Sequence, residues 1–402
     1  MKHGHENFRK SGKSFLSMNN TSSLAQARQM HDRLVSWLID DAYPVWATSG
    51  FDPVQRAFNE RLGAQGVVPN EARRARVQAR QVYAYSRAGS LGWRGDARPL
   101  VEAGLNFFIR HYLRADGLFH TLVEHDGVLK DDRVVLYDQA FALLALASCQ
   151  EVLGALPHII KHGVQLRTAL LERMHRPGGG FDSELTERTP LLSNPHMHLF
   201  EAALAWQALS PDPAWAALAD EVCGIALKYF IDQRTGALAE IFDEHWQVMP
   251  ESTRGQAIEP GHQFEWAWLL LCKDSSAGSA PRRVAERLFA IGENHGVKGG
   301  IAINTLNAEL RIKDPAARLW PQTERLKAAS RLGALTGEEH YWSSALGAAQ
   351  GLWRFLDHGA RGLWHDKIDR EGRFVAEPAP ASSFYHIICA IAEFGEALQR
   401  AS

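Results

Sequence analysis

The chain contains six short segments rich in glycine, aspartate and aromatic residues, which recur about every 60 residues. They begin at Ser49, Asp116, Gly178, Thr235, Gly299 and Arg361. A period of this length accommodates one pair of ordinary helices and their turns between successive segments. Six helix pairs predict an all-α toroid, an (α/α)6 barrel, with short connecting segments at its ends.

The stretches between these segments show two kinds of helical pattern. Residues 140–147 and 266–271 are apolar nearly all round, which is typical of helices packed on every side in an inner ring. Residues 281–287 are amphipathic and indicate an outer ring. The β-prone stretch 238–242 follows one glycine-rich segment, so we expect short β-hairpins on one face.

Composition narrows the class of protein. With 402 residues, 46% of them hydrophobic, the chain can bury a large core, and we expect one catalytic domain over residues 21–402. Residues 1–20 are polar and basic without an apolar region, which predicts a flexible extension rather than a secretory signal. No apolar run is long enough for a membrane span.

Charge and cysteine usage exclude further classes. The formal net charge of −2 gives no basic field, so we expect no nucleic-acid partner. Four cysteines lie scattered in apolar helical runs without a paired motif, which predicts reduced thiols and a cytoplasmic protein. A homodimer is compatible with the sequence.

A second set of positions repeats with the same period and carries polar or aromatic side chains. Each position begins a helical run assigned to the inner ring, so the set should gather at one mouth of the toroid. Its members are Arg76, Arg80, Tyr137, His198, His262, Trp320, Glu324 and His386.

The histidines are the strongest chemical signal in this set. His198 and His262 each follow a proline and precede a glutamate by three residues, Glu201 and Glu265 respectively. This spacing allows the carboxylate to orient the imidazole and raise its basicity. His386 opens an apolar helix, and the sequence shows no carboxylate partner for it. One histidine at a helix start is usually structural, but three at the same phase of a repeat favour proton transfer.

The other members suit a sugar pocket. Arg76 and Arg80 are four residues apart; they fit either a solvated basic face or a pair that binds a carbonyl or enediolate oxygen. Tyr137 is either a core residue or a cover for a sugar ring. Trp320 and Glu324 combine an aromatic face for C–H groups with a carboxylate for hydroxyls.

These motifs together resemble the N-acylglucosamine 2-epimerase superfamily of (α/α)6-barrel sugar epimerases and isomerases, over about residues 25 to 398. The resemblance is carried by residues 78–83, 194–202, 260–266, 318–321 and 385–386. It implies that Arg80 contacts the reactive oxygens and that His262 and His386 exchange protons at C1 and C2. It also implies that Asn194, His198 and Glu265 hold or open the sugar ring. In similar isomerases a tryptophan stands where this chain has Arg76.

The favoured function is isomerisation of unphosphorylated mannose to fructose without metal, nucleotide or nicotinamide, because no phosphate loop, dinucleotide motif or closed metal-ligand set appears. His386 is the expected base at C2 and His262 the group that delivers a proton, with Arg80 as the third catalytic residue. Epimerisation at C2 is the alternative. A glycoside hydrolase, a sugar-binding protein and a metal enzyme using three histidines are less favoured. The predicted substrate-binding residues are Arg76, Tyr137, Asn194, His198, Glu201, Arg254, Glu265, Trp320 and Glu324.

Overall fold

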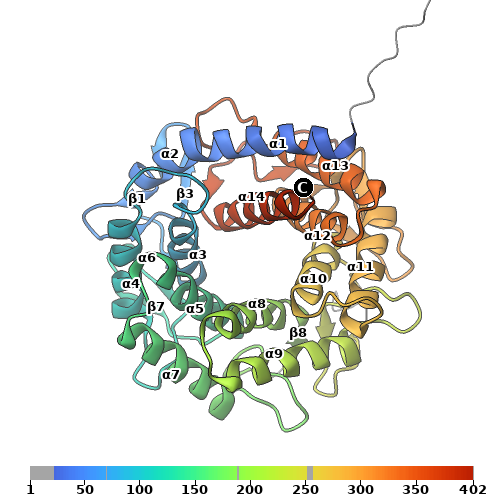
Figure 1. Ribbon diagram of the computed structural model, residues 1–402. Coiled ribbons are helices and arrows are strands. Elements are labelled where there is room, and N and C mark those ends of the chain that lie inside the picture. Colours follow the sequence, from blue (N-terminus) through green and yellow to red (C-terminus); the bar gives the residue numbers. More distant parts are fainter. Residues whose placement is uncertain (1–21, 69, 188–189, 251–256, 402) are drawn as a thin grey trace, which may run out of the picture.

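A computed structural model describes residues 22–68, 70–187, 190–250 and 257–401 of the protein. Its long helices form two concentric rings around a central axis (Figure 1). The inner ring consists of α3 (Ala75–Ser86), α5 (Leu136–Ser148), α8 (Ser193–Leu209), α10 (Pro260–Lys273), α12 (Trp320–Thr336) and α14 (Ser382–Arg400). The outer ring consists of α1 (Ser23–Trp37), α4 (Arg98–Tyr112), α7 (Pro157–Arg173), α9 (Pro213–Ile225), α11 (Ala280–Gly296) and α13 (Glu339–Leu356). This arrangement confirms the predicted (α/α)6 barrel.

The ring closes between the two ends of the described chain. The last helix, α14, packs against α3, and the first helix, α1, packs against α13 and α14. The remaining helical pieces are η1 (Leu38–Ala42), α2 (Tyr43–Thr48), α6 (Gln150–Leu153) and η2 (Ala226–Phe230). The predicted N-terminal extension, residues 1–20, lies outside the described residues, as does Arg254.

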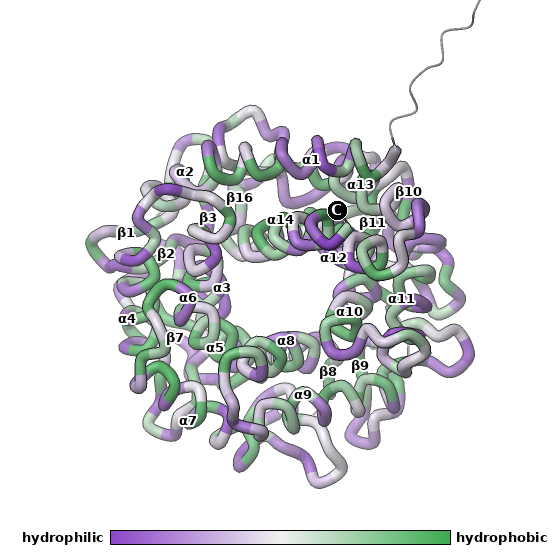
Figure 2. The backbone as a smooth tube through the Cα atoms, in the orientation of Figure 1, coloured by the Kyte–Doolittle hydropathy of each residue, from purple (hydrophilic) through white to green (hydrophobic). Residues whose placement is uncertain are grey.

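Hydrophobicity follows the two rings as the sequence predicted. Helix α5 is buried along nearly its whole length and appears largely green in Figure 2, whereas α11 alternates between hydrophobic and hydrophilic residues. Side chains of the inner ring therefore pack on all sides, which is where an all-round apolar helix is stable. The four cysteines are free, and three of them are buried. Within the described ranges, no helix combines the length and apolar content needed to cross a bilayer.

Short antiparallel strands connect the helices, as expected. They are β1 (Phe51–Asp52), β2 (Ala57–Phe58), β3 (Arg61–Gly63), β4 (Gly66–Val67), β5 (Arg73–Arg74), β6 (Leu122–Val123), β7 (Leu129–Asp131), β8 (Leu191–Leu192), β9 (Ile241–Phe242), β10 (Val297–Lys298), β11 (Ile301–Ala302), β12 (Thr305–Leu306), β13 (Ile312–Asp314), β14 (Ala317–Arg318), β15 (Lys367–Ile368) and β16 (Ala379–Pro380). They pair as β1-β2, β10-β11, β12-β13, β14-β15, β8-β9, β16-β3-β4 and β5-β6-β7. Several of these pairs join segments far apart in sequence, such as β16 with β3.

A buried glutamine near the start of an inner helix fastens each of four glycine-rich segments to the barrel. Gln139 Oε1 accepts the backbone N–H of Phe119 at 2.8 Å, and its Nε2 donates to the Phe119 carbonyl at 2.8 Å. The same two-way contact joins Gln78 to Phe58, Gln263 to Leu238 and Gln322 to Ala302. In the third repeat His196 accepts the N–H of Phe181 on Nε2 at 3.0 Å. These contacts fix the connecting segments over the N-terminal turns of the inner helices.

Replacing one of these glutamines should therefore destabilise the barrel. Gln139→Leu leaves a buried N–H and a buried carbonyl unpaired, and we expect the free energy of unfolding to fall by about 2–4 kcal/mol. Gln165→Leu, at an exposed position of α7, should change it by less than about 0.5 kcal/mol. Chemical denaturation of both variants measures the difference; equal stabilities would show that the contact is unimportant.

Candidate active site

The predicted polar positions gather around one cavity of about 330 Å³ at the end of the barrel where the inner helices begin. Nine of the twelve predicted site residues line it. They are Arg76, Arg80, Tyr137, Asn194, His198, His262, Glu265, Trp320 and His386. We call this cavity the histidine pocket.

Two other predicted residues lie behind the pocket wall. Glu201 accepts a hydrogen bond from His198 Nδ1 at 3.2 Å, and Tyr385 donates to its other oxygen. Glu324 is fully buried behind His386. Both carboxylates therefore contact the side chains that line the pocket, and neither lines it.

His386 has a carboxylate partner, contrary to the sequence-based expectation. Its Nδ1 lies 2.9 Å from Oε1 of Glu324, which is far away in sequence on α12. Donation from Nδ1 leaves Nε2 as the acceptor of the neutral ring. Burial, followed by the nearby charges of Arg80 and Lys327, holds the pKa of His386 well below its usual range. The side chain is therefore a neutral base at physiological pH.

A buried ammonium group, that of Lys327, lies beside the Glu324 carboxylate that contacts His386. Lys327 Nζ lies 2.6 Å from Glu324 Oε2, and both side chains are completely buried. The same Nζ sits 3.8 Å from the ring centroid of Trp268. Burial acts to lower the pKa of Lys327, but nearby carboxylates, the adjacent Glu324 foremost, outweigh it and raise the pKa above its usual value. Lys327 thus contacts one oxygen of Glu324, and the other oxygen accepts the hydrogen bond from His386.

His262 has the opposite charge state, and its partner also differs from the predicted one. Its Nδ1 contacts Oε2 of Glu240 at 2.9 Å rather than Glu265. Burial acts to lower the pKa of His262, but Glu240 and then Glu259 outweigh it and raise the pKa to about 9. Ser193 donates to the same Glu240 oxygen at 2.8 Å. His262 is therefore an imidazolium at neutral pH and can donate a proton.

Glu265 and His198 form a neutral part of the pocket wall. Burial and the neighbouring Glu324 raise the pKa of Glu265 well above its usual value, so this carboxylic acid carries a proton. Its Oε1 lies 3.9 Å from His198 Nδ1. Burial lowers the pKa of His198 to about 4. Glu265 can consequently donate a hydrogen bond to a sugar oxygen.

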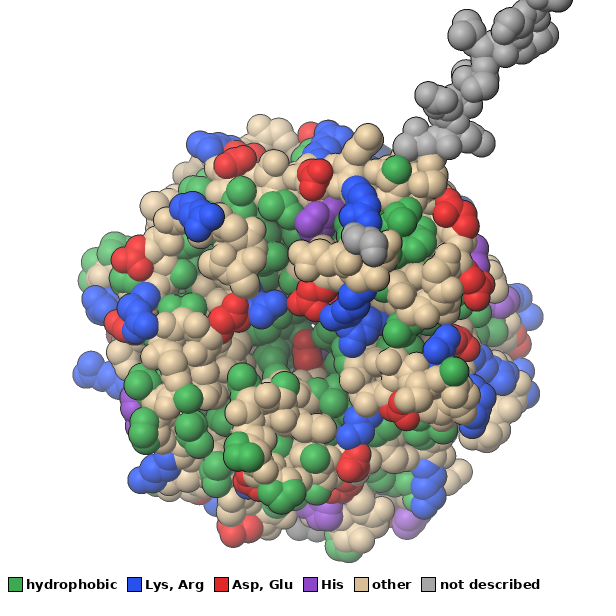
Figure 3. All heavy atoms as spheres, viewed as in Figure 1, with side chains coloured by type: hydrophobic (Ala, Val, Ile, Leu, Met, Phe, Trp, Pro, Cys, Tyr) green, Lys and Arg blue, Asp and Glu red, His purple; other side chains and the backbone are tan. Residues whose placement is uncertain are grey.

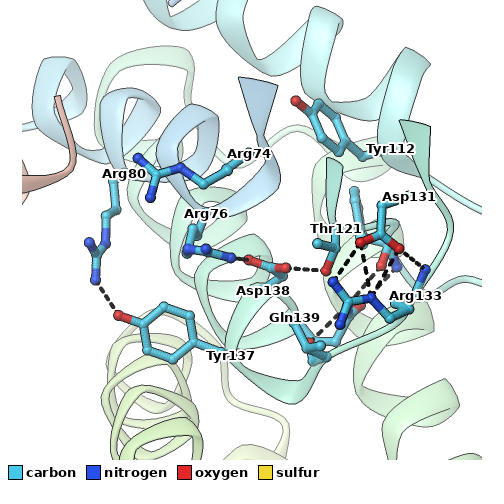
Figure 4. Close-up of polar contacts among 12 residues, drawn as sticks. Arg74, Arg76, Arg80, Tyr112, Thr121, Asp131, Arg133, Tyr137, Asp138 and Gln139 are labelled. Atoms are coloured by element: carbon cyan, nitrogen blue, oxygen red, sulfur yellow. Dashed lines mark hydrogen bonds and ion pairs between the residues drawn. The ribbon is translucent and has the colours of Figure 1, made fainter. Parts of the chain in front are cut away.

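Arg80 is a buried cation held without a carboxylate. Its Nη2 donates to the Tyr137 hydroxyl at 2.7 Å (Figure 4), and its guanidinium lies 4.2 Å from the ring centroid of Phe141. Among the described residues no carboxylate forms an ion pair with it, whereas Arg76 pairs with Asp138 at 3.2 Å. A buried guanidinium without a counter-ion is costly unless an anionic group binds it.

Trp320 packs against both histidines. Its ring centroid is 5.1 Å from that of His262 and 5.8 Å from that of His386. An aromatic ring close to both an acid and a base suits the C–H face of a sugar.

Two groups of side chains have a spacing that a metal ion could use. One consists of His198, Glu201 and Glu265; the other consists of Glu265, Glu324 and His386. In the second group the Lys327 ammonium already contacts Glu324, so a metal cation there would meet like charge. The expectation that the protein uses no metal and no cofactor stays a prediction.

Sequence reasoning missed Glu240, Lys327 and three cations at the pocket rim. The rim residues are Arg74, Arg318 and Lys367. Arg318 stands in one of the motifs that carry the family resemblance, but the others have no local signal. In the sequence Lys327 is indistinguishable from an ordinary helical lysine, and only the structure shows its contact with Glu324.

A second cavity, of about 550 Å³, opens at the other end of the inner helices. It is lined largely by hydrophobic side chains, including Leu144, Leu204 and Trp268. Figure 3 shows the central hollow of the molecule with hydrophobic side chains inside it. Glu201 lines this cavity, so it lies between the two ends of the barrel.

Comparison with known proteins agrees with this architecture. Residues 57–390 match the family model described as N-acylglucosamine 2-epimerase (GlcNAc 2-epimerase). A protein from Rhizobium meliloti (strain 1021) named mannose-6-phosphate isomerase is 47% identical over 378 residues, which cover 91% of this chain and 97% of that protein. The fold of a D-mannose isomerase crystal structure matches with a TM-score of 0.82 at 18% identity, covering 95% of this chain and 100% of the other. A cellobiose 2-epimerase from Spirochaeta thermophila DSM 6192 matches with a TM-score of 0.80 at 21% identity, covering 93% and 97% of the two chains.

The match to the family model spans most of the chain, and the Rhizobium relative is similar over nearly its full length. Both matches agree with the fold and with the sugar-type pocket. The protein therefore belongs to the N-acylglucosamine 2-epimerase family of sugar isomerases and epimerases.

Proposed function

We propose that this protein is an aldose–ketose isomerase that acts on a mannose-type sugar in the histidine pocket. The observation that carries this proposal is that a neutral His386 and a protonated His262 both pack against Trp320 in the same pocket. One group is ready to accept a proton and the other to donate one at the same pH.

The reaction uses these groups in two halves. His386 Nε2 takes the proton from C2 of the open-chain aldehyde, the C1–C2 bond becomes double, and negative charge passes to O1. His262 donates a proton to O1, and Arg80 stabilises the charge on oxygen in the transition state. His386 then returns its proton to C1 while His262 takes the proton of the O2 hydroxyl. The product is the ketose, and both histidines regain their starting forms.

Other pocket residues bind the sugar and assist the opening of its ring before the proton transfer. Glu265, as a neutral acid, donates to the ring oxygen and assists ring opening, with His198 beside it. Tyr137 and Trp320 contact the apolar faces of the sugar.

The name of the Rhizobium relative supports isomerisation of a mannose-type substrate, because it is 47% identical over almost the whole chain. The solved epimerase shares only the fold at its level of identity. Delivery of a proton from His262 to the opposite face of C2 would give the epimer instead, and product analysis separates the two reactions.

The reaction itself is tested by NMR in heavy water. Incubation with mannose and mannose 6-phosphate should give the corresponding ketose, with deuterium entering at C1. His262→Ala and His386→Ala should each lower kcat by roughly 100-fold or more, because each removes a proton-transfer group. His245→Ala, at an exposed position, is the matched control. A product that is only the C2 epimer would replace isomerase by epimerase, and near wild-type turnover in either pocket variant would remove that histidine from the mechanism.

The pH dependence of kcat/KM provides a separate prediction. Activity requires neutral His386 and protonated His262, so it should stay high through neutral pH and fall above about pH 9, as His262 loses its proton. Glu240→Gln removes the main charge that raises the pKa of His262, so the alkaline limb should move to lower pH. An alkaline limb that does not move in this variant would show that another group controls it.

A further inference from the structure

Two cations lie directly opposite each other on paired strands at the mouth of the histidine pocket. Strands β14 and β15 pair antiparallel, with Arg318 facing Lys367 across the strands. Like charges at such positions destabilise a strand pair. Both side chains line the histidine pocket. Each cation also contacts a carboxylate, but two cations held face to face at a pocket mouth are a reason to look for an anionic ligand.

Arg74 adds a third cation to this rim. It stands at the end of β5, immediately before α3, and it lines the same pocket. Its side chain projects near those of Arg76 and Arg80 from the start of α3 (Figure 4). The rim cations therefore come from two different parts of the barrel.

The carboxylates that pair with these cations lie deeper than the cations themselves. The Lys367 side chain is 48% exposed and its partner Glu377 23%, whereas Arg74 is 33% exposed and its partner Glu60 only 4%. Arg318 is likewise more exposed than its partner Glu259. Glu259 also lines the histidine pocket and Glu377 lines the cavity beside it, so the carboxylates hold the cations in position while the cations are the more exposed member of each pair.

A second, smaller cavity adjoins the histidine pocket at these cations. A neighbouring cavity of about 210 Å³ shares Arg74, Asp366, Lys367 and Ser382 with the histidine pocket and adds the charged residues Arg61 and Glu377. Room for a further chemical group therefore exists beside the cations.

We propose that Arg318, Lys367 and Arg74 form a subsite for a terminal phosphate group of the sugar, so that the substrate is a phosphorylated aldose. The subsite rests on the proposed function and narrows its substrate class. It differs from the neutral sugar that the sequence favours. Arg76, which the sequence paired with Arg80, is committed in the structure to the fully buried Asp138.

The geometry connects this subsite to the reacting end of the sugar through Trp320. The guanidinium carbon of Arg318 lies 5.1 Å from the ring centroid of Trp320, and the same ring lies beside His262 and His386. A sugar packed on that ring has C1 and C2 at the histidines and its opposite end toward the cations. A phosphate on the terminal carbon then accepts hydrogen bonds from arginine and lysine, which are stronger than those of a neutral hydroxyl.

Steady-state kinetics with mannose 6-phosphate and mannose test the subsite. We expect kcat/KM to be at least about tenfold higher for the phosphate ester, as charge-assisted hydrogen bonds predict. Lys367→Met and Arg318→Met should each raise KM for the ester about tenfold or more and reduce the preference for it. Lys130→Met, on the exposed hairpin strand β7 with its own partner Glu124, is the matched control and should leave the preference unchanged. Thermal unfolding checks that each variant is folded.

Binding of mannitol 6-phosphate, which cannot be isomerised, separates the subsite from the reaction. Calorimetry should show binding to the wild type that falls about tenfold or more in Lys367→Met and much less in Lys130→Met. Equal use of both sugars, together with equal binding to these two variants, would overturn the subsite and leave the isomerase proposal standing. Conversely, Lys367-dependent binding without conversion of either sugar would overturn the isomerase proposal and keep the subsite.

Discussion

The active-site arrangement depends on one buried ion pair, Lys327 with Glu324, in which both side chains are fully excluded from solvent. Such a pair gains little stability from its charges, because removing them from water is costly. The pair matters for the active site because the second oxygen of Glu324 accepts a hydrogen bond from Nδ1 of His386. Burial, followed by the charges of Arg80 and Lys327, lowers the pKa of His386, and the Glu324 carboxylate fixes its tautomer. A change at Lys327, which does not line the histidine pocket, therefore acts on the base of the reaction.

The barrel makes this arrangement possible by directing the starts of its inner helices toward one axis. His386 comes from α14, its partner Glu324 from α12, and Glu240 comes from the connecting segment in front of α10. The buried glutamines hold those connecting segments against the helices, so the carboxylate of Glu240 is positioned by the same contacts that stabilise the fold. Two histidines in similar helical positions consequently acquire opposite charge states, because their partners and neighbouring charges differ.

The periodic features of the chain could be predicted from sequence, because a repeat of this length constrains the number and packing of helices directly. The helix pairs, the inner and outer rings and the grouping of the histidines all followed from it. The carboxylate partners of the histidines, which lie far away in sequence, could not be predicted from the repeat. His262 was assigned to Glu265 by spacing alone, whereas the carboxylate that contacts it is Glu240, and His386 was left without a partner. The opposed pair Arg318 and Lys367 depends on strand pairing between distant segments, which no local pattern indicates.

The central claim is that the buried charges give the two histidines opposite protonation states, and NMR titration of 15N-labelled histidine tests it most directly. Spectra of His262→Gln and His386→Gln variants assign the two signals. At neutral pH we expect His262 to carry a proton on both ring nitrogens and to titrate near pH 9, while His386 is neutral with its proton on Nδ1. Lys327→Met should raise the pKa of His386. Two histidines that both titrate near the ordinary value of about 6.5 would contradict the account.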